Sequence, residues 1–229
     1  MPKQAPAVGE FYHVFNRGVD KRKVFLTPRN YERFTFLLFA CNNVKPFLNS
    51  QHSYRGLTSI GNLVEPDRVE LVDLICFCLM PNHFHLVLKQ KIEKGIPLFM
   101  QKLLTGYTMY FNALSKRTGA LFQGTYKAVH VENDGYLKHL VRYVHLNPAE
   151  LKEPKWKARG IANWKSTHNF VKNYYWSSYA DYLSEQRFHQ ILNIKLIGEL
   201  LDSAQSHEEF VKSWLVKDLG YIADKIIEV

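Results

Sequence analysis

Two histidines separated by one apolar residue stand in an apolar run over residues 75–87. The run reads Ile-Cys-Phe-Cys-Leu-Met-Pro-Asn-His-Phe-His-Leu-Val, with His83 and His85 on either side of Phe84. On a β-strand, residues i and i+2 point to the same face, so both imidazoles project together while Phe84 points into a core. Two adjacent neutral imidazoles form half of a site for a divalent cation. The spacing alone fits equally a strand that carries two half-buried histidines.

A second candidate group is a tyrosine on a helix expected over residues 134–146. His139, Tyr143 and Asn147 follow one another at i, i+4 and i+8 beside an apolar stripe, so Tyr143 should lie at the edge of the core. A tyrosine can attack a phosphate when a nearby cation stabilises the charge of that phosphate. Most helical tyrosines, however, serve packing. The stripe consists of Leu137, Leu140, Val141 and Val144.

The elements that must position these side chains follow the order strand, helix, strand, strand, helix, strand, helix. Their patterns predict strands over 11–17, 69–80, 84–90 and 121–131, and helices over 27–41, 97–116 and 134–146. The first six elements are typical of a ferredoxin-like α+β fold, in which two helices cover one face of a four-stranded antiparallel sheet. The other face is then open to the helix at 134–146.

Two segments fall outside this pattern. Residues 44–68 are polar and contain Pro and Gly, which indicates a long loop of functional or disordered character. Residues 151–229 are basic and aromatic at first and then read as small helices, so we expect a domain over 1–150 and a helical extension over 151–229. Aromatic side chains between Lys and Arg suit base stacking and phosphate contacts, and they suit packing onto the domain equally well.

The composition points to a polyanionic partner and a reducing compartment. Thirty Lys and Arg against 21 Asp and Glu give a net charge of +9, which favours nucleic acid as a partner. Three cysteines in apolar surroundings do not make a disulfide framework. The N-terminus has no signal-peptide pattern and no apolar run is long enough for a membrane span, so we expect a cytoplasmic protein without membrane contact.

Four ordered motifs together resemble one known family. They are His-Val-Phe-Asn-Arg-Gly at 13–18, Leu-Met-Pro-Asn-His-Phe-His-Leu at 79–86, Arg-Tyr-Val-His-Leu-Asn-Pro at 142–148 and Trp-Ser-Ser-Tyr at 176–179. The chain resembles the single-tyrosine HUH transposases, named for the His-hydrophobic-His pattern, and within them the REP-associated tyrosine transposases. The motifs span most of the chain, and their combination is far more specific than any single one.

The resemblance implies a metal-dependent enzyme that cuts and rejoins single-stranded DNA next to hairpins or palindromic repeats. It assigns His83 and His85 to Mg²⁺ or Mn²⁺ and makes Tyr143 the nucleophile of a 5′-phosphotyrosine intermediate. Mg²⁺ prefers oxygen ligands. Asn147 stands where related transposases have a glutamine as the third ligand, with a side chain one methylene shorter. Candidate DNA-binding residues are Arg17, Lys127, Lys155 and Arg159.

Three other functions remain open from the sequence. A replication-initiator or relaxase-type nickase would use the same chemistry, although those families usually have longer chains and a differently placed tyrosine. A non-catalytic nucleic-acid-binding protein would need neither metal nor Tyr143, and a metal-dependent hydrolase would need the metal only. The sequence also leaves open whether one chain forms the site or a homodimer shares it.

Overall fold

The protein is built on a four-stranded antiparallel sheet with the strand order β2-β3-β1-β4. The computed structural model describes residues 5–45, 67–201 and 204–214. The strands are β1 (Phe11–Arg17), β2 (Val72–Met80), β3 (His83–Gln90) and β4 (Lys127–His130). Strands β3 and β1 lie in the centre, which is the ferredoxin-like arrangement that the element order predicts. The predicted α+β fold is confirmed.

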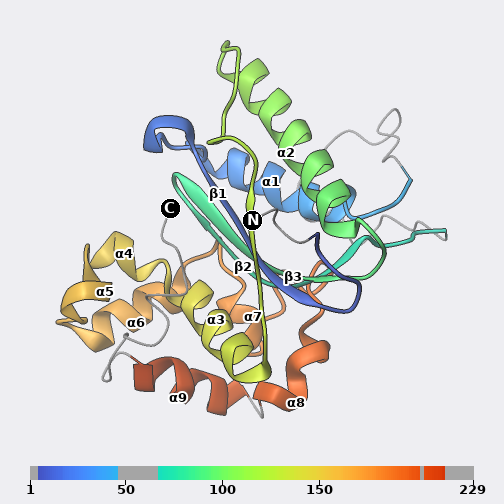
Figure 1. The fold of residues 1–229 in the computed structure, drawn as a ribbon. Coiled ribbons are helices and arrows are strands. Elements are labelled where there is room, and N and C mark those ends of the chain that lie inside the picture. The colour runs from blue at the N-terminus through green and yellow to red at the C-terminus, as the bar shows by residue number, and fades with distance from the viewer. Residues whose placement is uncertain (1–4, 46–66, 202–203, 215–229) are drawn as a thin grey trace.

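Two helices, α1 (Pro28–Ala40) and α2 (Gly95–Leu114), cover one face of the sheet (Figure 1). The start of α1 is fixed by Asn30, whose Oδ1 accepts from the backbone N–H groups of Leu26 and Thr27 at 2.9 and 3.0 Å. Pro28 then suits the first turn, where its missing N–H is not needed. Between these helices and the sheet lies an apolar core to which Phe84 contributes from β3. Phe84 thus points away from its two histidine neighbours, as predicted.

The opposite face of the sheet carries helix α3 (Asp134–Leu146), which packs against β2 and β3 (Figure 1). The predicted apolar stripe of α3 is buried in a second core that also takes in Cys76, Cys78 and Val87 from the sheet. The helices after α3 complete this layer. They are α4 (Ala149–Lys152), α5 (Trp156–Arg159), α6 (Trp164–Asn173), α7 (Tyr179–Tyr182), α8 (Gly198–Leu201) and α9 (Ala204–Trp214). Short 3₁₀ turns lie at Val19–Lys21 and Ile194–Ile197.

The outer edge of β2 is paired with a segment from far along the chain. Leu79 N donates to Trp176 O at 2.9 Å, and Ser178 N donates to Phe77 O at 3.0 Å. Cys78 and Ser177 form an isolated antiparallel bridge between these bonds. Residues 176–178, which we call the edge segment, therefore satisfy backbone groups that an edge strand would otherwise present to solvent.

The fourth strand is shorter than the sequence predicted. The expectation was a strand over 121–131, but β4 extends only from Lys127 to His130. Gly124 adopts a φ of +59° and interrupts the extended run. The residues before it bond individually instead, with Gln123 N donating to Arg17 O at 2.8 Å.

Three further expectations concern the long loop, the division into domains and membrane-spanning helices. Most of the predicted 44–68 loop lies outside the described residues. The division of the chain at residue 150 stays a prediction. Within the part of the chain that the structure describes, no helix is both long and apolar enough to cross a bilayer.

Candidate active site

The two central strands bring three histidines together on the face that carries α3. Phe15 of β1 pairs with His85 of β3, and Arg17 pairs with His83. Because side chains alternate along a strand, His13, His83 and His85 all project to this face. The rings of His83 and His85 lie 5.0 Å apart in a T-shaped arrangement, and those of His13 and His85 stack at 5.1 Å. The predicted pair is therefore a group of three imidazoles.

Each histidine of the predicted pair has a partner at Nδ1. His83 Nδ1 lies 2.7 Å from Oδ1 of Asn82, and His85 Nδ1 lies 2.9 Å from Nε2 of His13. His13 is 1% exposed, and burial lowers its pKa to about 3, so its ring is neutral at physiological pH. Sequence analysis did not assign a role to either His13 or Asn82.

Tyr143 lies on α3 directly above these rings. Its ring centroid is 5.7 Å from that of His85 and 6.3 Å from that of His13, edge-on in both cases. Asn133 caps the start of α3, because its side chain accepts from Tyr136 N at 2.9 Å, and this cap fixes where the helix starts on the sheet. One chain therefore assembles the phenol and the imidazoles.

Asn147 follows the last residue of α3 and is buried. Its Nδ2 donates to the backbone carbonyl of Tyr143 at 3.0 Å, so the amide is held against its own helix. An amide ligates a metal through its oxygen, and the assignment of Asn147 as the third ligand stays a prediction. Among the described residues, no group of three or more His, Cys, Asp or Glu side chains is placed to hold a metal ion. The residues present fit a cation held by two imidazoles that completes its shell with oxygen from elsewhere.

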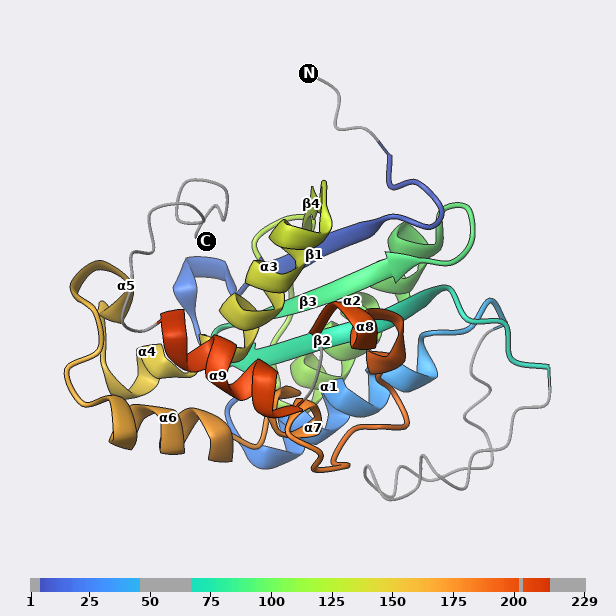
Figure 2. The ribbon, with the colours of Figure 1, turned by 90° about the horizontal axis from the view of Figure 1, so that it is seen from below.

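The candidate DNA-binding residues divide into two pairs. Arg17 and Lys127 both lie on the histidine face, because Arg17 pairs with His83 and Lys127 pairs with Phe15. Lys127 is exposed, and its Nζ lies 5.8 Å from the centre of the Phe15 ring. Lys155 directly precedes α5 and Arg159 is its last residue, and both side chains are exposed. Helix α5 lies beyond the C-terminal end of α3 (Figure 2). The first pair borders the histidines, and the second belongs to the C-terminal extension over residues 151–229, which we call the tail.

A buried hydrogen-bond network that sequence analysis did not find holds α3 in place. His145, fully buried on α3, approaches Ser178 Oγ with its Nε2 at 3.0 Å and His207 Nε2 with its Nδ1 at 3.1 Å. Ser178 Oγ in turn accepts from Phe77 N on β2 at 2.9 Å. No local sequence pattern connects His145 to Ser178 and His207, which lie 33 and 62 positions away. We call His145, Ser178 and His207 the anchor network.

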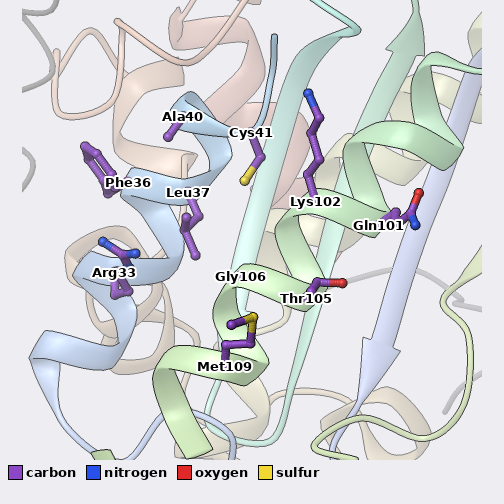
Figure 3. Close-up of a pocket in the computed structure, with 10 residues that line it drawn as sticks. All are labelled: Arg33, Phe36, Leu37, Ala40, Cys41, Gln101, Lys102, Thr105, Gly106 and Met109. Carbon is purple, nitrogen blue, oxygen red and sulfur yellow. The ribbon is translucent and has the colours of Figure 1, made fainter. Parts of the chain in front are cut away.

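A groove of about 600 Å³ lies on the other side of the molecule, between α1 and α2. In Figure 3, Arg33, Phe36 and Leu37 lie on α1, and Lys102 lies across the groove on α2. The ammonium group of Lys102 donates to the carbonyls of Asn43 and Val44, so it holds the segment that follows α1. Because α1 and α2 cover the face of the sheet opposite to α3, the groove is separate from the histidine face.

Comparisons with known proteins place part of this chain in one family. Residues 35–147 match the family model described as "Transposase IS200 like". The matched range contains β2, β3 and α3 with His83, His85 and Tyr143.

The comparisons with solved structures and with curated proteins give less information about the family. A solved structure of a REP-associated tyrosine transposase bound to a REP hairpin matches with 10% identity and a TM-score of 0.48, over 84% of this chain and 90% of that chain. A likeness at that level supports no conclusion about function. No curated protein matches the sequence. The part of the chain that holds the histidines and the tyrosine is therefore similar to the IS200-like transposases.

Proposed function

We propose that the protein cuts and rejoins single-stranded DNA through Tyr143, as a metal-dependent transposase of the REP-associated type. One observation carries the proposal: the Tyr143 ring lies 5.7 Å from His85 on the face where β3 also presents His83. A phenol beside two imidazoles brings a nucleophile and a cation site to a single phosphate. The target, DNA next to hairpin or palindromic repeats, comes from the resemblance of the four motifs.

In the proposed reaction, Tyr143 Oη forms a bond to phosphorus as the bond from phosphorus to the 3′ oxygen breaks. The phenol loses its proton, and the departing 3′ oxygen takes one up, so the product is a 5′-phosphotyrosine and a free 3′-OH. Rejoining runs the same exchange in reverse with a new 3′-OH. A divalent cation, Mg²⁺ or Mn²⁺, held by His83 and His85 would supply charge stabilisation at the phosphate.

The chain's own groups orient the DNA around that phosphate. Arg17 and Lys127 place positive charge on the same face as the histidines, where they can hold the backbone on either side of the scissile bond. Lys155 and Arg159 are proposed to contact DNA farther from the cut, because α5 lies beyond the end of α3 (Figure 2). A net charge of +9 favours such contacts.

The test uses labelled single-stranded oligonucleotides from hairpins that flank the gene, with Mn²⁺ or Mg²⁺, on a denaturing gel. The proposal expects a protein–DNA adduct that survives SDS and that is lost in Tyr143→Phe, in His83→Ala and in chelator. Tyr175→Phe serves as the matched control, because Tyr175 is an exposed tyrosine on the tail. Its adduct should equal that of the wild type.

The hydrolase and the non-catalytic binding protein give different results in the same experiment. Metal-dependent cutting without an adduct would remove the role of Tyr143 and identify a plain hydrolase. Hairpin binding that persists in chelator, without cutting, would identify a non-catalytic binding protein.

A further inference from the structure

We propose that Asn82 and His13 are positioning residues that set the tautomers of His83 and His85, so that both present the Nε2 lone pair to a cation. The inference rests on the proposed function, because it concerns how the same cation site is prepared. Neither residue would touch the metal. Each acts through the Nδ1 of the histidine next to it.

The orientation of the Asn82 amide determines where His83 carries its proton. Asn82 Nδ2 donates to the backbone carbonyl of Lys21 at 3.3 Å. A carbonyl can only accept, so the NH₂ group must face Lys21 and the amide oxygen must face His83. Since that oxygen also only accepts, His83 Nδ1 is the protonated nitrogen at 2.7 Å. The neutral ring then has its lone pair on Nε2.

The backbone around Asn82 is held as firmly as its side chain. Asn82 O accepts from Gly18 N at 2.8 Å, and Pro81 O accepts from the N–H groups of Val24 and Phe25 at 2.8 and 3.1 Å. A Cβ at residue 18 would lie 2.3 Å from Arg22 O, so the loop after β1 can fold this tightly only with glycine at that position. Hydrogen bonds therefore hold the β2–β3 turn, which leads into His83, against the loop after β1.

His13 serves His85 in the corresponding way. Its Nε2 lies 2.9 Å from His85 Nδ1, and only one proton can occupy that contact. If His85 is to coordinate through Nε2, the proton must be on its Nδ1, and His13 Nε2 must accept it. Both rings are buried in the centre of the sheet, His13 at 1% and His85 at 5% exposure, so the contact is shielded from competing water.

The two contacts differ in their partners, and under the proposal both leave Nε2 to the cation. His83 is oriented by an amide in a turn, and His85 by a neutral imidazole on the neighbouring strand. Outer-shell partners of this kind typically change metal affinity 10- to 100-fold when they are removed. We expect a loss within that range for each of the two residues.

The experiment pairs each disruptive variant with one that keeps an acceptor. Asn82→Ala and His13→Phe remove the acceptor, whereas Asn82→Asp and His13→Gln keep an oxygen near the same place. Asn173→Ala, an exposed asparagine on α6, is the control. Two quantities are measured on the full chain: the affinity for Mn²⁺ alone by calorimetry, and the tautomer of each histidine without metal by long-range ¹⁵N NMR. Thermal unfolding confirms that each variant is folded.

The proposal expects His83 to carry its proton on Nδ1 in the wild type and to lose that preference in Asn82→Ala. Mn²⁺ affinity should fall at least 10-fold in Asn82→Ala and in His13→Phe and recover in large part in Asn82→Asp and His13→Gln. Unchanged affinity in both disruptive variants would overturn the proposal, and so would a wild-type His83 protonated on Nε2. A wild type without Mn²⁺ binding that depends on His83 would also overturn it.

Failure of the positioning role can be told apart from failure of the proposed function. If the wild type forms the tyrosine adduct and all variants bind Mn²⁺ equally well, the positioning role fails alone. If Mn²⁺ affinity follows the expected pattern but no adduct forms, the positioning role stands and the function of Tyr143 fails.

Discussion

At the scale of single residues, the candidate site combines groups that the sequence makes visible with groups that it hides. His83 and His85 stand two apart on a strand, and Tyr143 stands on a helix with a clear stripe, so local periodicity predicts their orientation. His13 is 70 positions from His83 and meets His85 only through strand pairing. The Asn82 amide is oriented by the backbone carbonyl of Lys21, 61 positions away. Neither contact has a local sequence signal.

Charge on the histidine face gives a prediction at this scale. Lys127 is exposed beside Phe15, so Lys127→Ala should weaken binding of single-stranded DNA and lower the slope of log K against log salt by about 0.7, the share of one phosphate contact. Arg29→Ala is the matched control, because Arg29 is exposed on α1 at the opposite face. Fluorescence anisotropy between 50 and 200 mM salt measures both. An unchanged slope in Lys127→Ala would remove Lys127 from the interface.

At the scale of elements, the position of α3 depends on the tail as much as on the sheet. The anchor network ties the C-terminal half of α3 to β2 through Ser178 and to α9 through His207. Tyr143 is two residues before His145, so the network also fixes the height of the phenol above the histidines. The tail is therefore part of the support of the site.

The buried histidines of the anchor network predict how stability changes with pH. Burial lowers the pKa of His207 to about 4 and that of His145 well below 6.5, with His207 adding to the effect at His145. The unfolded chain then binds more protons than the folded one below pH 6.5. The free energy of unfolding should therefore fall as pH drops from about 6.5 towards 4, by about 1.4 kcal/mol for each unit of pKa difference.

Urea unfolding at pH 7.5, 6 and 5 measures this change. His207→Gln should reduce the slope, whereas His189→Ala should leave it as it is, because His189 is exposed. Equal slopes in the wild type and His207→Gln would show that His207 does not drive the acid sensitivity.

Element boundaries show where sequence patterns stop being informative. Helices α1, α2 and α3 begin and end within two residues of the predicted ranges, because caps and stripes are local signals. Strand β2 has a register shift between Leu74 and Cys76 that places Ile75 in the α3 core, and β4 is cut short at Gly124. Both features depend on partner strands, which alternation within one strand does not reveal.

At the scale of the whole molecule, one chain brings together all parts of the candidate site. Tyr143 lies on a helix that packs on its own sheet, and the tail continues the same apolar core through Trp156, Val171 and Tyr179. The fold class and the site face followed from the sequence, but the choice between one chain and two did not. Whether one chain or two form the site depends on whether α3 covers the sheet of its own chain or that of a partner.

A mixing experiment tests this arrangement. If each chain forms its own site, Tyr143→Phe and His83→Ala proteins mixed in equal amounts should form no adduct with the hairpin oligonucleotide. A shared site would restore about a quarter of the wild-type yield, because half of the dimers would be mixed and one of the two sites in each mixed dimer would be intact. The adduct on a denaturing gel measures the outcome, and each variant mixed with wild type serves as the control.

The edge segment has a consequence for any chain that is shortened before residue 176. Strand β2 is nine residues long and buried throughout, and residues 176–178 pair with its outer edge. A chain shortened to residue 150 would expose an apolar strand with open donors and acceptors, which is a template for aggregation. Natural shortening before this segment would thus be selected against even if every catalytic group survived.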